Sequence, residues 1–261
     1  MDNKIKIALV SYLNTLPFEW ALEGLVRKDK IEIIKTVPSE CANLLKRRKV
    51  DLALIPSGAL EDIEDGEIVT DYCIGCDGPV RSVCIFSSSS LDQINKLYLD
   101  SHSRTSHLLA RIVIESFFNN SQVDYEVAHV EDIDFLEDHE AVLMIGDKVF
   151  GKEDIFRFKT DLGQVWKENT GLPFVFAVWV QRSSNPVDEI LLNLINKAFE
   201  REINKILSGH LKIKKDDRFK VNLESYFRTN ISYTFAKAKK MSILLFQEKV
   251  NKIKHWKAIE T

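Results

Sequence analysis

Four polar turns interrupt apolar segments of this 261-residue chain and carry the side chains best suited to chemistry. They are SYLNT at 11–15, PSGALED at 56–62, DSHSRTS at 100–106 and IGDKVF at 145–150. The first contains Ser11 and Asn14 but no glycine, whereas a phosphate-wrapping loop needs glycines so that its backbone can approach closely. We therefore expect side chains to bind a ligand at this turn.

Two of these turns are suited to binding an anion. Hydroxyl residues stand where helices are expected to begin, and free backbone N–H groups with the positive end of the helix dipole favour a carboxylate or phosphate there. The candidate ligand contacts in the two turns are Ser57, Gly58, Ser103, Arg104, Thr105 and Ser106. Ordinary helix caps use the same residue types, so each turn taken alone also fits a structural role.

The segment CDGPVRS at 76–82 contains the strong turn signal Asp-Gly-Pro. It is either an exposed crossover loop or a loop that directs Ser82 into a cleft. Arg81 and Arg104 could pair with ligand carboxylates, because the planar guanidinium matches a carboxylate with two hydrogen bonds. Solvated arginines fit the same pattern. Gly146 and Asp147 of the fourth turn complete the polar set.

Patterns of well-known catalytic and metal sites are missing. The chain has no nucleophile elbow, no HExxH and no phosphate loop. Of its four cysteines, Cys73 and Cys76 form the single CxxC, and neither the other two nor the scattered histidines supply a second ligand pair for zinc. We expect buried thiols, no metal and no cofactor.

Composition excludes several classes of partner. The net charge of -3 and pI near 6.1 give no field that would attract a nucleic acid. No stretch approaches the roughly 18 apolar residues of a membrane span. The start MDNKIKIALV lacks the pattern of a secretory signal, so a cytoplasmic protein is expected.

Strand and helix signals alternate, which indicates an α/β fold with parallel strands and ligand-binding loops at their carboxyl ends. We expect an outer lobe formed by 1–85 and 180–261 and an inserted lobe formed by 86–179. Strands near 83–87 and 174–182 would cross between the lobes, leaving a cleft that Phe174 and Phe176 could help to wall. Apolar positions 243–246 fit either a core or the surface of a homodimer.

Several segments together resemble one protein family. They are VSYLNTLP, DLALIPSGALED, CIGCDGPVRSV, SRTSHLLARIV, AVLMIGD and DLGQVWKENTGLPFVFAVW, which lie in order between residues 4 and 182. The chain resembles the chorismate dehydratases of the futalosine route to menaquinone. CDGPV and the last of these segments are the most specific, whereas the carboxyl-terminal helices match only in general character.

The resemblance implies a type II periplasmic-binding-protein-like fold, with two α/β lobes joined by two crossing strands and the ligand cleft between them. It also implies removal of water from chorismate, with the substrate's own enolpyruvyl carboxylate as the base. Asn14 and Ser82 match the family's functional positions and would orient the reacting groups. The hydroxyls and helix-start amides of the second and third turns would hold carboxylates.

Two other functions share this architecture. The related 1,4-dihydroxy-6-naphthoate synthases use a histidine in the turn where this chain has 145–147, and their first turn has a different pattern. Solute-binding proteins normally carry an export signal or a lipid anchor, which the start of this sequence does not resemble.

Overall fold

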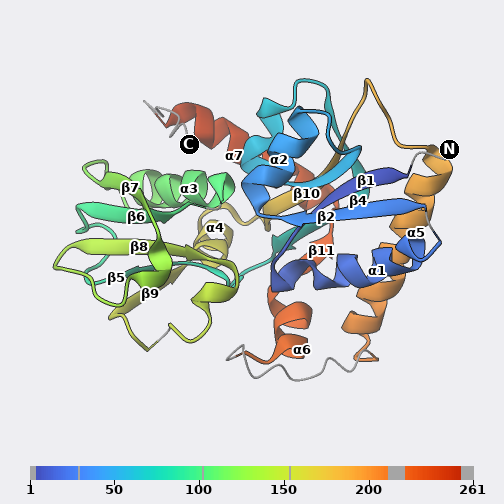
Figure 1. The fold of residues 1–261 in the computed structure, drawn as a ribbon. Helices are drawn as coiled ribbons and strands as arrows, with labels where there is room; N and C mark the ends of the chain where they lie inside the picture. Colours follow the sequence, from blue (N-terminus) through green and yellow to red (C-terminus); the bar gives the residue numbers. More distant parts are fainter. Residues whose placement is uncertain (1–3, 29, 102, 153, 211–220, 254–261) are drawn as a thin grey trace.

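The computed structural model describes residues 4–28, 30–101, 103–152, 154–210 and 221–253. Within them, two β-sheets lie side by side and helices cover their faces (Figure 1). The helices are α1 (Leu16–Val26), α2 (Pro38–Lys46), α3 (Arg104–Arg111), α4 (Leu162–Thr170), α5 (Glu189–Leu207), α6 (Leu223–Ser225) and α7 (Lys237–Lys252). None of them is long and apolar enough to cross a bilayer.

The first sheet has six strands in the order β11-β4-β10-β3-β1-β2. Its strands are β1 (Ile5–Val10), β2 (Ile31–Thr36), β3 (Leu52–Pro56), β4 (Gly66–Cys76), β10 (Phe174–Arg182) and β11 (Ser232–Thr234). β1 pairs in parallel with β2 and β3, as the alternating pattern predicts. β10 runs antiparallel between β3 and β4, so the sheet is mixed. Every residue of β3 is buried, as expected for a continuous apolar run covered on both faces.

The second sheet has five strands in the order β7-β6-β8-β5-β9. Its strands are β5 (Val83–Ser87), β6 (Lys96–Asp100), β7 (Asp124–Ala128), β8 (Glu140–Ile145) and β9 (Phe158–Asp161). β6 is parallel to both neighbours, whereas β5 is antiparallel to β8 and β9. Helix α3 ends at Arg111, and the chain continues as a π-helical turn, Ile112–Phe117.

The chain passes between the two sheets at two loops, 77–82 and 171–173. All strand partners of β5 lie in the second sheet, and all strand partners of β10 lie in the first sheet. Neither strand therefore crosses from one lobe to the other. We propose lobe boundaries that follow the sheets. The first lobe is 4–76 with 174–253 and the second lobe is 83–170, which moves the expected inner boundaries by three to nine residues.

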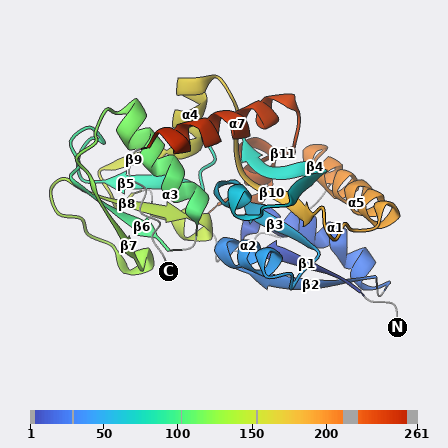
Figure 2. The same ribbon diagram turned by 90° about the horizontal axis from the view of Figure 1, so that it is seen from above.

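Helix α7 belongs to the first lobe by sequence but packs against both lobes, as Figure 2 shows. The indole N–H of Trp166 on α4 donates to Ser242 Oγ at 3.1 Å, and the ring of Phe246 lies 6.1 Å from that of Trp166. Ile243 and Phe246 are buried, whereas Leu244 is 66% exposed. The apolar run of α7 therefore contributes to the core, and the homodimer stays a prediction.

All four cysteines are buried and free, as expected, so the CxxC pair forms no disulfide. The Cys76 thiol lies close to the start of α4. A Cβ added at Gly163 would come within 2.5 Å of that sulfur and 2.8 Å of the Gly78 carbonyl oxygen. The absence of a side chain at Gly163 thus allows α4 to approach loop 77–82.

Candidate active site

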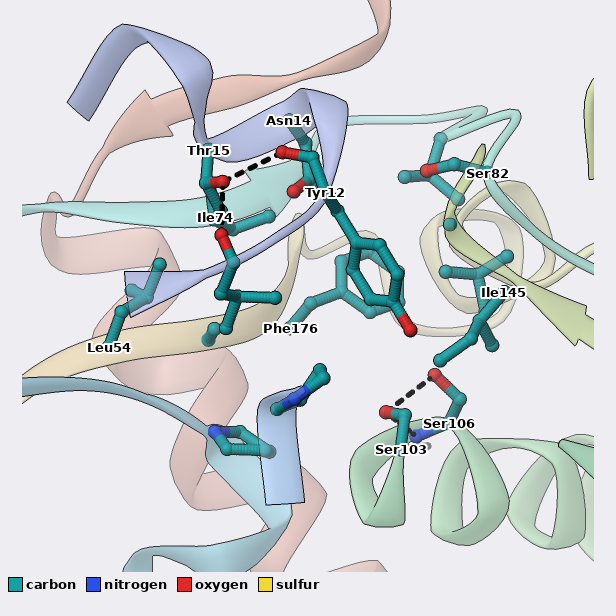
Figure 3. A pocket seen from close by; sticks show the side chains of 17 residues that line it. Tyr12, Asn14, Thr15, Leu54, Ile74, Ser82, Ser103, Ser106, Ile145 and Phe176 are labelled. Atoms are coloured by element: carbon teal, nitrogen blue, oxygen red, sulfur yellow. Dashed lines mark hydrogen bonds between the residues drawn. The ribbon is translucent and has the colours of Figure 1, made fainter. Parts of the chain in front are cut away.

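A cavity of about 50 Å³ lies between the two lobes. Its polar lining consists of Tyr12, Asn14, Thr15, Ser82, Ser103 and Ser106 (Figure 3). Its apolar lining comes mainly from β1, β3, β4 and β10 of the first lobe and from the end of β8 in the second. No described residue of this lining carries a charged side chain, so recognition of a ligand there depends on neutral hydrogen-bonding groups.

The turn after β1 places Asn14 in this cavity. Thr15 Oγ1 donates to the carbonyl oxygen of Val10 at 2.6 Å and lies 2.7 Å from that of Tyr12, as Figure 3 shows. These contacts fold residues 13–15 into a 3₁₀ turn that leads directly into α1. The Tyr233 hydroxyl donates to the carbonyl oxygen of Asn14 at 3.1 Å. The turn is therefore held by side chains, in agreement with its lack of glycine.

Loop 77–82 places Ser82 in the same cavity. The carboxylate of Asp161, which caps α4, accepts the backbone N–H groups of Val80 at 3.1 Å and Arg81 at 2.6 Å. Arg81 has a φ of +63°, a left-handed conformation that is uncommon for a residue with a side chain. Ser82 is 1% exposed, and its Oγ accepts a hydrogen bond from the Tyr226 hydroxyl at 2.8 Å.

The start of α3 supplies two further hydroxyls. Ser103 caps the helix by accepting the N–H of Ser106, and the two side-chain oxygens lie 3.1 Å apart. The phenol of Tyr12 points toward this helix start in Figure 3. Its hydroxyl is buried and has no hydrogen-bond partner within the described residues. Burial, with smaller effects of nearby carboxylates, raises the pKa of Tyr12 well above its usual value, so the phenol remains a neutral donor.

Five of the residues predicted from the sequence line the cavity: Asn14, Ser82, Ser103, Ser106 and Gly146. Gly146 lies against Tyr12 across the boundary between the lobes. A Cβ added at Gly146 would come within 2.9 Å of the Tyr12 ring, and the φ of +66° there also favours glycine. Gly146 thus permits close approach of the lobes. Ligand binding by the five lining residues remains a proposal.

Four other residues that were predicted to contact a ligand form contacts between the lobes and do not line the cavity. The Gly58 N–H donates to Thr105 Oγ1 at 2.9 Å, and that hydroxyl donates to the Phe176 carbonyl oxygen at 3.3 Å. Arg104 forms an ion pair with Asp62 of the first lobe. Asp147 accepts the Leu13 N–H at 3.1 Å. A polar group at a helix start can bind either a ligand or a neighbouring lobe. In this structure, these groups bind the neighbouring lobe.

The remaining predicted residues also lie outside the lining. Ser57 is buried and donates to the carbonyl oxygen of Val175 at 2.7 Å. Of the two phenylalanines expected to wall the cleft, Phe174 packs in the core against Trp166, whereas Phe176 lines the cavity. Ser11 is exposed, and Arg81 contributes its backbone N–H to the contact with Asp161.

Tyr226 and Tyr233 were not expected at the site. They come from the carboxyl-terminal part of the first lobe, in the π-helical turn Tyr226–Asn230 and in β11. Each contacts a predicted catalytic residue more than a hundred positions away in sequence. No local motif around either tyrosine predicts such a contact.

The burial of Asp147 predicts a dependence of stability on pH. Burial raises the pKa of Asp147 to about 6, although the hydrogen bond from Leu13 acts in the opposite direction. A carboxyl whose pKa is higher in the folded state favours folding at low pH, and this contribution is lost as the pH rises from about 4 to about 6. The variant Asp147→Asn keeps an acceptor for the Leu13 N–H but cannot ionise.

We therefore expect Asp147→Asn to gain about 2 kcal/mol of stability over the natural protein as the pH rises from 4.5 to 7. Urea unfolding at a series of pH values measures this difference. A difference between the two proteins that stays constant with pH would mean that Asp147 ionises normally in the folded state.

Comparisons with known proteins agree with this geometry. The profile of a family described as menaquinone biosynthesis matches residues 5–252. The chain is 25% identical over 214 residues to a protein of Thermus thermophilus named chorismate dehydratase, covering 74% of this chain and 75% of that one.

Solved structures with a similar fold include a protein of Archaeoglobus fulgidus, with a TM-score of 0.67 at 13% identity, covering 95% of this chain and 97% of that one. A ligand-binding component of an ABC-type import system from Staphylococcus aureus has a TM-score of 0.63 at 11% identity, covering 96% and 92%. A Candida albicans protein described as having the generic periplasmic-binding-protein fold has a TM-score of 0.52 at 14% identity, covering 96% and 94%. Identities this low show the fold alone.

Proposed function

The chain belongs to the menaquinone-biosynthesis family, and we propose that it is a chorismate dehydratase, which converts chorismate to 3-[(1-carboxyvinyl)oxy]benzoate and water. Its fold is of the periplasmic-binding-protein type. The Thermus thermophilus relative carries the name of this activity. We infer a small-molecule substrate, no cofactor and a cytoplasmic location.

One observation carries the proposal. The side chains of Asn14, Ser82, Ser103 and Ser106 come from three segments far apart in sequence and line one cavity. Chorismate is compact and carries two carboxylates, which these hydroxyls, the amide of Asn14 and the amides at the start of α3 can hold without a cationic side chain. Neither Arg81 nor Arg104 lines the cavity, and Arg104 pairs with Asp62, so we propose that these neutral groups hold the carboxylates.

The elimination itself breaks two bonds on the chorismate ring. The C3–H bond gives up its proton, its electron pair forms a new C3–C4 π-bond, and the hydroxyl on C4 leaves, so that proton and hydroxide together make one water. Formation of the aromatic ring drives the reaction. The task of the protein is then to position the substrate and stabilise developing charge.

The lining of the cavity supports a base supplied by the substrate. Its described residues include no carboxylate or imidazole, and the Asp147 carboxylate is directed to Leu13 instead. We propose that the enolpyruvyl carboxylate removes the C3 proton. Asn14 orients that side chain or the leaving hydroxyl, and Ser82 donates a hydrogen bond to the bound substrate.

The size of the cavity requires the lobes to move. About 50 Å³ is far below the roughly 300–1,000 Å³ typical of ligand pockets. Chorismate can therefore enter only when contacts between the lobes are released, as in hinge closure of two-lobed proteins. The hydrogen bonds of Gly58 to Thr105 and of Leu13 to Asp147 join the lobes, and we propose that they break on opening and re-form around the ligand.

Tyr12 is expected to contribute to substrate binding. Because its buried hydroxyl lacks a partner, Tyr12→Phe removes a donor that only a ligand would use. We expect KM for chorismate to rise about tenfold, the equivalent of one hydrogen bond, while thermal stability stays equal or increases slightly. Steady-state kinetics and thermal melts measure both. An unchanged KM would show that the phenol does not reach the substrate.

Incubation of the purified protein with chorismate, followed by mass spectrometry of the products, tests the activity. Loss of one water to a carboxyvinyloxybenzoate, absent from a protein-free incubation, is the expected result. Tight binding without turnover would indicate a solute receptor. Turnover of cyclic dehypoxanthinyl futalosine in place of chorismate would indicate the related naphthoate synthase.

A further inference from the structure

The hydroxyl of Tyr226 is hydrogen-bonded to Ser82, a residue of the cavity lining. It donates to Ser82 Oγ at 2.8 Å, and both residues are 1% exposed. Tyr226 does not itself line the cavity, whereas Ser82 does. Any effect of Tyr226 on a ligand must therefore pass through another side chain.

The direction of this hydrogen bond determines where the proton of Ser82 can point. Burial raises the pKa of Tyr226 well above its usual value, while hydrogen bonds with Ser82 and Asn14 oppose this effect, so the phenol keeps its proton. A serine hydroxyl has one proton and two lone pairs. With one lone pair occupied by Tyr226, Ser82 retains its own proton to donate toward the cavity.

Packing holds Tyr226 in this orientation. Its ring meets Phe150 of the second lobe edge-on, with ring centres 5.2 Å apart, and lies 5.6 Å from Phe227. The same π-helical turn also holds loop 77–82, because Asn230 Nδ2 donates to the Pro79 carbonyl oxygen at 2.9 Å. The segment from Tyr226 to Asn230 thus fixes both the backbone near Ser82 and its hydroxyl.

We propose that Tyr226 is a positioning residue for the dehydration: it holds the Ser82 hydroxyl so that its proton faces the bound substrate. This inference rests on the proposed function. A residue with such a role affects the chemical step more than ground-state binding, because the orientation of Ser82 matters most where charge develops on the leaving oxygen.

The variant Tyr226→Phe tests the inference, since it keeps the ring contacts with Phe150 and Phe227 and removes the donor. We expect kcat for chorismate to fall about 10- to 100-fold, as for a misplaced catalytic group, with KM changed less than about threefold and an unchanged melting temperature. Tyr125→Phe is the matched control. Its hydroxyl donates to Glu115 at 3.3 Å in the second lobe, away from the cavity, and its loss should leave both constants unaltered.

A double-mutant cycle shows whether Tyr226 acts through Ser82. In a Ser82→Ala background, adding Tyr226→Phe is expected to lower kcat by a clearly smaller factor than in the natural protein, because the contact with Ser82 is already gone and only the contact with Asn14 remains to be lost. Full, multiplicative losses in the double variant would overturn the inference, as would an unchanged kcat in the single variant when the natural protein is active.

A readout that needs no activity separates this inference from the proposed function. In a crystal structure of Tyr226→Phe, we expect the Ser82 side chain to leave the orientation it has beside Tyr226. An inactive natural protein would refute the dehydratase proposal, whereas an unmoved Ser82 hydroxyl would refute the positioning role alone.

Discussion

Replacing Asn14 by alanine is expected to lower kcat for chorismate by about 100-fold or more, the loss seen when one preorganised donor to a transition state is removed. The Asn14 side chain lines the cavity, while its backbone oxygen is held by the Tyr233 hydroxyl. Truncation of the side chain leaves that backbone contact intact. The turn should therefore keep its shape, and the loss should appear in turnover and not in folding.

Mass spectrometry of chorismate incubations measures this loss, with a thermal melt as the check on folding. The control is Asn193→Ala, which makes the same change at an exposed position of α5 and should leave turnover unaltered. If Asn14→Ala dehydrates chorismate at the natural rate, Asn14 has no part in the reaction. A rise in KM with unchanged kcat would limit its role to binding.

Short strands in which apolar residues predominate could be predicted from the sequence almost to the residue. The segments IKIALV and KLYLD coincide with β1 and β6, and the periplasmic-binding-protein-like fold is confirmed. β4 was not predicted, because the first half of GEIVTDYCIGC is largely exposed and includes residues that disfavour strands. Its strand conformation depends on pairing with β10, which lies about a hundred residues further along the chain.

Only those residues of the candidate site that lie in a recognisable turn could be predicted from the sequence. Ser103 and Ser106 were identified because their turn offers hydroxyls at the start of a helix, whereas Asn14 and Ser82 were identified from the family resemblance as well as from their turns. The same local argument also selected Arg104 and Asp147, which join the lobes.

Nothing in a turn specifies whether its partner is a ligand or another part of the chain. For the same reason, the contact from Tyr226 to Ser82 is visible only in the folded protein. The residues that support a catalytic group can lie anywhere in the sequence, because packing alone brings them together.

Asp161→Ala is expected to be the most destabilising of these changes. The Asp161 carboxylate accepts four backbone N–H groups, from Val80, Arg81, Gly163 and Gln164, at 2.6 to 3.1 Å. Loss of the helix cap and of acceptors for buried donors should lower the free energy of unfolding by about 3 kcal/mol. This corresponds to a fall of about 6–12 °C in melting temperature for a chain of this size.

Turnover should fall with stability in Asp161→Ala, because the same carboxylate holds Arg81 in its left-handed conformation directly before Ser82. Asp188→Ala is the control. Asp188 also caps a helix, but it is exposed and accepts a single N–H, from Leu191 at 3.0 Å, so its loss should cost about 1 kcal/mol without an effect on kcat. Asp161→Asn, which keeps one acceptor oxygen, should fall between the two. Equal losses for Asp161→Ala and Asp188→Ala would mean that Asp161 only caps α4, and that loop 77–82 keeps Ser82 in place without it.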